Sequence, residues 1–233
     1  MPIISIISHF YNHPGMVEQQ VEHWKRIDPK ILPYLEFILV DDCSEDRPNL
    51  TRGNLNLRLF RVVTDIPWNQ AGARNLAAFH AAGEWGLFFD IDQQINVDNL
   101  VVLLGNVGQF DKKTMYYLRA NGIYDSINDA HLSNHPNTYF VNMSRFRSMG
   151  MFDEDFAGHY GYEDLYMPRV WEAAGGNRVL LNEPVFFDEL GFRTTSFNRD
   201  LERNKQLMIQ KLVSGCRNSP GILRFEWNEV EVL

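Results

Sequence analysis

The chain has 233 residues, long enough for one large α/β domain, since single hydrophobic cores extend to roughly 250 residues before a chain divides. Apolar residues make up 45% and charged residues 22%, which argues against a disordered chain or a coiled coil. Lys and Arg number 22 against 30 Asp and Glu, and the resulting net charge of −8 argues against a surface that binds nucleic acid.

Cysteine usage and the N-terminus bear on where the protein works. Cys43 and Cys216 could form one disulfide at most, which favours a reducing compartment. The N-terminus lacks the charged region, the apolar region and the cleavage site of a signal peptide. No apolar run approaches the roughly 20 residues that span a bilayer. We therefore expect a cytoplasmic protein with no integral membrane segment, either whole or cut from a longer chain.

Strand and helix patterns alternate along the first half of the chain. Apolar and β-branched runs predict strands over 3–8, 35–40, 57–63 and 85–89. Helical spacing of apolar residues predicts helices over 16–27, 70–82 and 97–107. Asn69 is suited to cap the second of these helices and Gly83 to end it. The alternation predicts a doubly wound α/β fold with a mostly parallel sheet.

Beyond about residue 110 the pattern is more mixed. The predicted strands there are 114–119, 138–142 and 178–181. The predicted helices are 145–149, 164–174 and 199–213, the last of them amphipathic. The sequence contains no internal repeat and no Gly/Ser linker, so we expect a single domain over residues 1–233 with two halves that meet near residue 110.

Three of the predicted parallel strands end in polar clusters. These clusters are His9-Phe10-Tyr11-Asn12, Asp41-Asp42-Cys43-Ser44 and Asp90-Ile91-Asp92. Any one of them could be an ordinary turn, because Asp, Asn and Ser are common turn residues. Ligands of open α/β sheets bind beyond the carboxyl ends of the strands, so the three clusters together predict a ligand site.

Asp90 and Asp92 could hold a metal ion. They lie two residues apart, so in an extended segment both carboxylates would project to the same side. Mg²⁺ or Mn²⁺ typically binds through one or two carboxylates together with substrate phosphate oxygens. The pattern therefore favours a divalent cation that arrives with a phosphate-bearing substrate.

Glu163 and Asp164 form a second acidic pair at the start of a predicted helix. They are either an acidic cap that the helix dipole favours or a carboxylate base beside the Gly- and aromatic-rich segment 158–162, whose rings could stack on a sugar. Pro168 cannot sit deep inside a regular helix, so we expect the helix to begin near Asp164 or to kink.

The remaining motifs exclude some functions. Arg74 lies in the first turns of a helix and could meet an anion, although an Arg on a surface helix is usually solvated. Neither a G-x-G-x-x-G fingerprint nor a P-loop occurs, which argues against dinucleotide oxidoreductases and P-loop NTPases. His131 and His135 fall in a predicted loop and do not indicate a zinc site. Trp171 and the pair Phe186-Phe187 are best interpreted as core.

The motifs, taken in order, resemble a known family. Ile4–Asn12 resembles an opening strand that normally ends in Pro-Thr-Tyr-Asn, and Phe37–Ser44 resembles a Val-Asp-Asp-x-Ser element. Ala71–Asn75 resembles an Ala-Arg-Asn helix, Asp90-Ile91-Asp92 a metal-binding D-x-D, and Gly161–Asp164 a Glu-Asp element that supplies a base. Over roughly residues 3–175 the set resembles the inverting nucleotide-sugar glycosyltransferases of family 2, which have the GT-A fold. The resemblance implies a Rossmann-like, mostly parallel sheet flanked by helices, with a smaller mixed region on the acceptor side.

The resemblance also implies how the donor is bound, chiefly by about residues 1–110. The residues implied at the nucleotide sugar are His9, Phe10, Tyr11, Asn12, Asp42, Gln70, Arg74, Asp90 and Ile91. Tyr11 would stack on the nucleobase, Asp42 would accept a hydrogen bond from it, and Arg74 would approach the diphosphate. The donor implied is a nucleotide-diphosphate sugar, with a UDP-sugar favoured.

Metal and base assignments complete what the resemblance implies. Asp92, with Asp90, would hold Mn²⁺ or Mg²⁺. Asp164, beside Glu163, would take the proton from a hydroxyl of a saccharide or glycoconjugate acceptor that attacks the anomeric carbon, so that one displacement inverts that centre. We expect the acceptor to meet loops such as 123–137 in the second half of the chain.

The sequence departs from the family pattern at several positions. His9 and Phe10 replace the usual Pro-Thr, and the last histidine is His159, although relatives often carry a histidine metal ligand beyond the Glu-Asp element. Asp188, Glu189 or water could replace that ligand. The segment 193–211 is similar to one that closes over the site in some relatives, but a charged helix facing solvent is the simpler interpretation. The Q-x-x-R-W motif and membrane helices of processive synthases are missing.

Two alternatives belong to other functional classes. A catalytically inactive module that binds a sugar nucleotide or a glycan could keep the same fold, although the presence of both Asp92 and Asp164 argues against it. A sugar-phosphate nucleotidyltransferase would need a Gly-rich loop with Arg or Lys after the first strand, and the segment 9–15 contains neither Arg nor Lys.

Overall fold

The computed structural model describes residues 1–120, 134–181, 186–190 and 199–233. Its centre is a parallel sheet formed by the four strands predicted in the first half of the chain. These strands are β1 (Ile4–Phe10), β2 (Leu35–Asp41), β3 (Leu57–Val62) and β4 (Trp85–Phe88), in the spatial order β3-β2-β1-β4. The predicted α/β class and mostly parallel core of the sheet are thus confirmed.

Antiparallel strands extend this core on both sides. β7 (Asn134–Asn142) pairs antiparallel with β4, and β6 (Thr114–Ala120) pairs antiparallel with β7. β8 (Asn177–Leu180) and β9 (Phe186–Glu189) then add in parallel to β6. The short strands β5 (Gln93–Ile95) and β10 (Trp227–Val230) pair antiparallel with β9 and β3.

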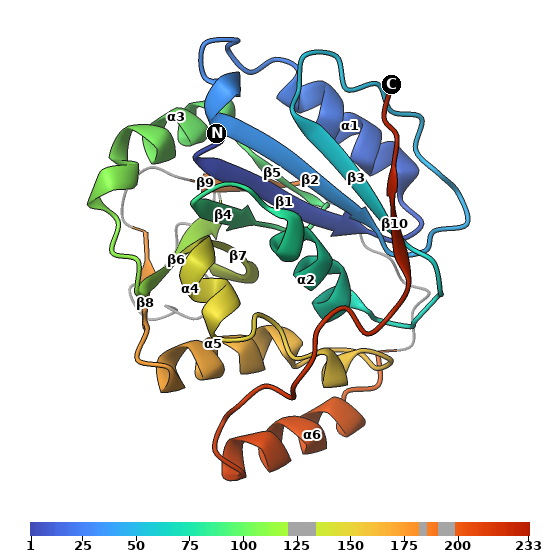
Figure 1. The fold of residues 1–233 in the computed structure, drawn as a ribbon, viewed down its shortest axis with the longest axis vertical. Helices are drawn as coiled ribbons and strands as arrows, with labels where there is room; N and C mark the ends of the chain where they lie inside the picture. Colours follow the sequence, from blue (N-terminus) through green and yellow to red (C-terminus); the bar gives the residue numbers. More distant parts are fainter. Residues whose placement is uncertain (121–133, 182–185, 191–198) are drawn as a thin grey trace.

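Helices cover both faces of the sheet (Figure 1). On one face, α1 (Pro14–Trp24) and α3 (Val97–Asn106) enclose a core that contains Ile6. On the other face, α2 (Gln70–His80), α4 (Met143–Ser148) and α5 (Glu163–Ala173) enclose a core that contains Ile7. Neighbouring residues of a strand point to opposite faces, so an unbroken apolar run such as that of β1 fills both cores. Three short 3₁₀ helices, Leu32–Tyr34, Val107–Gln109 and Glu154–Phe156, complete the described helices.

The C-terminal segment is fastened back onto the domain. Helix α6 (Glu202–Val213) ends beside the loop that carries Asp153 and Asp155, and Lys211 Nζ lies 2.8 Å from a carboxylate oxygen of each. Figure 1 shows α6 outermost on the side of α5, and the chain then returns across the domain to β10. Over the described ranges, no helix has both the length and the apolar character needed to cross a membrane.

Several local predictions need correction. Asn69 stands at the N-terminus of α2, but its side chain makes no capping hydrogen bond, and its Nδ2 donates to Asp42. Gly83 is not a left-handed helix end: its N–H donates to the buried Glu36 carboxylate, and a Cβ there would lie 2.5 Å from Ser5 Oγ. Residue 135 belongs to β7 rather than to a loop.

The helix around Pro168 begins where the sequence predicted, next to Asp164. Helix α5 begins at Glu163 and contains Pro168 within it. Pro168 is the sixth residue of α5, so the helix lacks the one backbone hydrogen bond that an N–H at this position would donate to the preceding turn. Trp171 is fully buried and Phe187 is 1% exposed, so their assignment to the core is confirmed. Much of the loop 123–137 proposed to meet the acceptor lies outside the described residues.

Candidate active site

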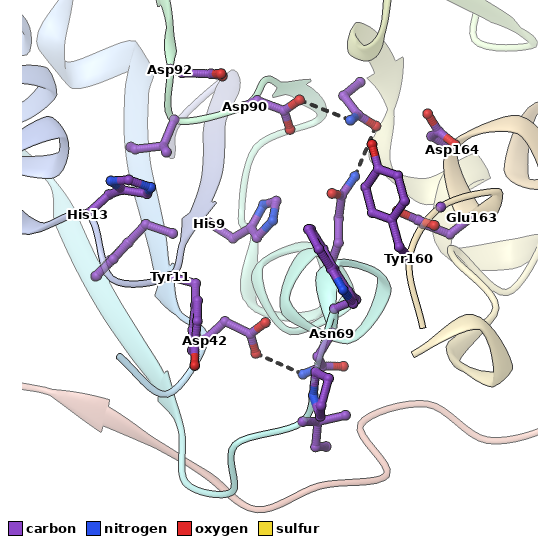
Figure 2. Close-up of a pocket in the computed structure, with 18 of the residues that line it drawn as sticks. His9, Tyr11, His13, Asp42, Asn69, Asp90, Asp92, Tyr160, Glu163 and Asp164 are labelled. Carbon is purple, nitrogen blue, oxygen red and sulfur yellow. Dashed lines mark hydrogen bonds between the residues drawn. The ribbon is translucent and has the colours of Figure 1, made fainter. Parts of the chain in front are cut away.

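A cavity of about 580 Å³ lies at the carboxyl ends of β1, β2 and β4. Figure 2 shows carboxylates, imidazoles and aromatic rings that enter it from separate elements. Most of the residues singled out in the sequence line this cavity: His9, Phe10, Tyr11, Asp42, Gln70, Asp90, Ile91, Asp92, Glu163 and Asp164. Asn12 and Arg74 are the two predicted residues that are not among its lining. The fold therefore brings together strand ends that are far apart in sequence.

Tyr11 and Asp42 face each other at one end of the cavity (Figure 2). The hydroxyl of Tyr11 donates to Asp65 Oδ2 at 3.3 Å, which fixes the ring at the cavity wall. Asp42 is 6% exposed and accepts a hydrogen bond of 2.9 Å from Asn69 Nδ2. Burial, together with the charges of Asp41 and Asp65, raises the pKa of Asp42 to about 7 despite that hydrogen bond. This carboxyl group can therefore accept or donate a hydrogen bond near neutral pH.

Asn12 ties two strand ends together. Its backbone is left-handed, with φ 54°, a conformation that Asn tolerates better than most residues. Its N–H donates to Ser44 Oγ and its Oδ1 accepts from the N–H of Glu45, both at 2.8 Å. Asn12 thus holds the loop after β1 against the loop after β2 and sets the position of Tyr11.

Asp90 is held by partners from two other elements. Arg74 Nη2 lies 2.5 Å from Asp90 Oδ1, Asn137 Nδ2 donates to Oδ2 at 2.9 Å, and His135 Nδ1 lies 3.6 Å from Oδ2. Burial opposes ionisation of Asp90, but the charge of Arg74, with help from His135 and His9, lowers its pKa below the ordinary value. Asp90 is therefore ionised at neutral pH and its position is fixed before any ligand binds.

Arg74 lies beneath the cavity rather than in its wall. Its side chain is 1% exposed and is neutralised by Asp90. The resemblance places this residue at the diphosphate, whereas here it contacts Asp90 and Asn137 and lies 5.7 Å from the ring centre of Phe152. The geometry supports an indirect action of Arg74, through the position and charge of Asp90.

Asn137, on β7, joins the residues of this network. Its Oδ1 accepts hydrogen bonds from Gln70 Nε2 and Arg74 Nη1, each at 3.1 Å, while its Nδ2 donates to Asp90. A side-chain amide has an oxygen that can accept from two donors and a nitrogen that can donate to a carboxylate. Nothing in the sequence pattern singled it out, because its role depends on β7 lying next to β4.

Asp92 offers a carboxylate to a divalent cation. Ile91 and Asp92 form a turn and not the extended segment assumed above, yet both line the cavity. The carbonyl of Asp92 accepts a hydrogen bond of 2.7 Å from the N–H of Leu190, just after β9, which holds the turn. Asp188 was a candidate to replace the histidine metal ligand of relatives. It pairs in register with Gln94 and is not among the described residues that line the cavity.

The donor set fits a cation that completes its coordination with ligand oxygens. Within the described ranges, no cluster of three His, Cys, Asp or Glu side chains is arranged to hold a metal. Asp92 and Asp90 are hard oxygen donors, and Mg²⁺ and Mn²⁺ commonly bind to one or two carboxylates plus substrate phosphates. The residues present therefore fit such a metal together with a phosphate-bearing ligand.

Glu163 and Asp164 begin α5 and line the far side of the cavity from Tyr11 (Figure 2). Gly161 and Tyr162 precede them with left-handed φ values of 80° and 72°, which turn the chain sharply into the helix. Burial and the neighbouring Asp164 raise the pKa of Glu163 to about 8, and its Oε2 has no hydrogen-bond partner among the residues described. Burial also raises the pKa of Asp164. Both residues therefore begin the helix and line the cavity at the same time.

The structure adds lining residues that were not selected from the sequence. They include His13, Asp65, Trp68, Asn69, His135, Asn137, Tyr160 and Arg199. Arg199 lies 5.5 Å above the ring of Tyr160. This residue belongs to the segment 193–211, whose simpler interpretation was a charged helix facing solvent, and it shows that part of the segment reaches the cavity. His9 is held neutral, because burial and the charge of Arg74 lower its pKa to about 4.

Comparisons with known proteins identify the family and the fold. The sequence model of glycosyl transferase family 2 matches residues 5–166. No curated protein matches the sequence. Among solved structures, S. aureus TarS residues 1–349 in complex with UDP-GlcNAc has a TM-score of 0.71 and 18% identity, covering 91% of this chain and 67% of that one.

Two further structures define the extent of the likeness. A longer S. aureus TarS structure has a TM-score of 0.65 and 18% identity, covering 91% of this chain but only 40% of TarS. The mannosyltransferase PcManGT from Pyrobaculum calidifontis, in complex with GDP-Man and Mn²⁺, has a TM-score of 0.61 and 16% identity, covering 92% of this chain and 63% of that one. At such identities the likeness establishes the fold, and all three neighbours are longer than this chain.

Proposed function

The chain belongs to glycosyl transferase family 2 and is a glycosyltransferase with the GT-A fold, and from this premise we propose that it moves a sugar from a nucleotide-diphosphate sugar to a hydroxyl group of a saccharide or glycoconjugate. The observation that carries the proposal is the single cavity in which Tyr11, Asp42, Asp92 and Asp164 meet. A UDP-sugar is the favoured donor, supported by the TarS complexes with UDP-GlcNAc and with UDP. The PcManGT complex with GDP-Man makes a GDP-sugar the competing donor.

The nucleotide binds at the Tyr11 end of the cavity in this proposal. The ring of Tyr11 is half-buried and held by Asp65, so one aromatic face is available for a nucleobase. Asp42 accepts a hydrogen bond from a base N–H, and its carboxyl is already oriented by Asn69. A hydrogen bond from the base N–H favours the ionised form of Asp42, so nucleotide binding lowers the pKa of this carboxyl group.

The diphosphate lies toward Asp92 and Asp90. Asp92 would hold Mn²⁺ or Mg²⁺, and Asp90 contributes a fixed negative charge in a position that Arg74 and Asn137 determine. The bound cation supplies charge compensation for the departing diphosphate. The Mn²⁺ in the PcManGT complex supports a divalent cation of this kind.

Asp164 acts as the general base. Its carboxylate takes the proton from the acceptor hydroxyl while that oxygen forms a bond to the anomeric carbon. The bond from the anomeric carbon to the diphosphate oxygen breaks in the same step, and its electron pair leaves with the nucleoside diphosphate. Attack from the opposite face inverts the anomeric centre. The raised pKa of Asp164 makes it a stronger base than an exposed Asp.

Asp164→Asn tests this assignment, because it keeps the size and polarity of the side chain but removes the base. We expect kcat for nucleotide release in the presence of an acceptor to fall by about 10²–10⁴-fold, the usual contribution of a general base. The affinity for UDP, measured by calorimetry, should stay at the wild-type value. Asp46→Asn, at an exposed position outside the cavity, is the matched control. Wild-type turnover by Asp164→Asn would rule out Asp164 as the base.

A further inference from the structure

Two aromatic rings line the cavity next to the proposed base. Trp68 precedes α2, and Tyr160 lies three residues before Glu163. Their ring centres are 4.5 Å apart with an interplanar angle of 55°, and both residues line the cavity. In Figure 2, Tyr160 lies beside Glu163 and Asp164 and across the cavity from Tyr11. The proposed function gives neither ring a role, although the sequence suggested that rings of the segment 158–162 could stack on a sugar.

The backbone carries strain that places Trp68 at this position. Its φ of 52° is left-handed, which is unusual for a bulky residue and costs on the order of 1–2 kcal/mol. Pro67 fixes the chain before it, and the carbonyl of Pro67 accepts a hydrogen bond of 2.7 Å from the N–H of Gly158. The loop before α2 is thereby joined to the loop of Tyr160. Persistent strain at a cavity wall is a reason to look for a role in binding.

A role in packing alone does not account for these rings. Residues that only fill the core of this protein are almost completely covered, as Trp24, Trp85 and Trp171 are. Trp68 and Tyr160 are half-buried, and they line a cavity that the carboxyl groups of Glu163 and Asp164 also line. Arg199, which lies over the ring of Tyr160, holds that ring in place.

Apolar rings beside hydrogen-bond acceptors suit a particular ligand. A pyranose has apolar C–H faces and a rim of hydroxyl donors, so it packs against an aromatic ring while its hydroxyl groups bind carboxylates. Nucleobases also stack on rings, but Tyr11 and Asp42 serve that purpose at the opposite end of the cavity. We propose that Trp68 and Tyr160 form a sugar-binding wall that contacts the face of a neutral pyranose beside Asp164.

This inference rests on the proposed function, which supplies two sources of such a pyranose. One is the sugar of the donor, and the other is the sugar of the acceptor. Both must approach Asp164 at the moment of transfer, so the wall could contact either. The ligand chemistry is the same in the two cases, and the experiment must separate them.

The test compares ligands with and without a sugar on Trp68→Ala and Tyr160→Ala. Calorimetry with Mn²⁺ gives the affinities for UDP, UDP-GlcNAc and UDP-glucose, and saturation-transfer NMR detects methyl β-glucopyranoside in the presence of UDP. If the wall binds the donor sugar, Trp68→Ala weakens the UDP-sugars by about three- to tenfold relative to UDP, as loss of a ring contact implies. If it binds the acceptor, that ratio stays unchanged and the saturation-transfer signal of the glucoside is lost.

Controls separate the wall from a structural effect. Tyr160→Phe keeps the ring and should behave like wild type, and Tyr34→Ala removes an exposed ring far from the cavity. The proposal is overturned if Trp68→Ala weakens UDP and UDP-sugars equally, or if it changes neither the ratio nor the glucoside signal. Failure of the proposed function would give another result, because the wild-type protein itself would bind neither UDP nor GDP. That result would contradict both the proposed function and the sugar-binding wall.

Discussion

Individual carboxyl groups in this cavity differ in charge because their immediate partners differ. Asp90 is paired with Arg74, so its pKa lies below the ordinary value. Glu163 and Asp42 are buried without a cation in contact, so their pKa values rise to about 8 and about 7. Enzymes commonly separate the pKa values of neighbouring acids in this way to assign them different tasks. In this cavity Asp90 is ionised at neutral pH, whereas Glu163 is largely neutral.

Glu163 should make stability depend on pH. Its pKa is about 8 in the folded chain and near the ordinary 4.5 in the unfolded chain, so the folded state binds more protons between these values. Wild-type stability should therefore fall as pH rises through this window. Glu163→Gln removes the titration, so we expect it to match wild type near pH 5 and to be more stable near pH 8.5.

Thermal unfolding of the two proteins across this pH range measures the difference. Glu231→Gln, at an exposed position near the C-terminus, is the control. The difference between its Tm and that of wild type should be the same at every pH. A constant difference between Glu163→Gln and wild type from pH 5 to 8.5 would show that Glu163 does not titrate in this window.

How far single residues can be predicted depends on where their partners come from. Tyr11, Asp42, Asp90 and Asp92 follow apolar strands, so their clustering follows from the rule that ligands bind at the carboxyl ends of parallel strands. Asn137 could not be identified, because its partners lie on α2 and in the turn after β4, and no local pattern reports such contacts.

At the level of elements, apolar content decided which strands could be predicted. β2 and β4 are buried throughout and β1 at every residue except His9, and their apolar runs identify them. β5, β9 and β10 have three or four residues each and are too short to show a period. Two of the three residues of β5 and two of the four residues of β10 are polar or charged. The antiparallel insertion of β7 beside β4 also lay beyond the sequence pattern, although it places Asn137 and His135 at the cavity.

Helix α6 supports the loop that carries Tyr160. Asn204 is fully buried, and its Nδ2 lies 2.9 Å from the carbonyl of Phe156 and 2.8 Å from those of His159 and Gly161. Asn204→Ala should lower the free energy of unfolding by about 2 kcal/mol, because buried carbonyls lose their donor. The same change should reduce turnover by loosening the loop before Glu163.

Chemical denaturation and steady-state nucleotide release measure these two effects. Gln206→Ala, on the exposed face of the same helix, is the matched control. It should leave both the free energy of unfolding and the turnover close to the wild-type values. If Asn204→Ala lost stability but kept wild-type turnover, the loop would not depend on α6 for its catalytic position.

For the whole molecule, the negative charge of the cavity determines which ligands can bind. Six carboxyl groups line it, from Asp42, Asp65, Asp90, Asp92, Glu163 and Asp164. In the described part of its wall, Arg199 is the one side chain with a permanent positive charge. The chain as a whole carries a net charge of −8. A nucleoside diphosphate would be repelled by such a surface, so its binding should require a divalent cation.

The most direct test of this account is a thermal-shift panel of UDP, GDP, CDP and dTDP, each with and without Mn²⁺, on wild type, Asp92→Asn and Asp46→Asn. At about 100 times Kd a ligand stabilises the folded state by about 2.7 kcal/mol, which corresponds to a rise in Tm of about 5–10 °C for a domain of this size. We predict that UDP gives the largest shift, that the shift requires Mn²⁺, and that Asp92→Asn loses it while Asp46→Asn keeps it. Absence of a shift with every nucleotide, or an equal shift with and without Mn²⁺, would contradict a metal-dependent nucleotide-sugar site.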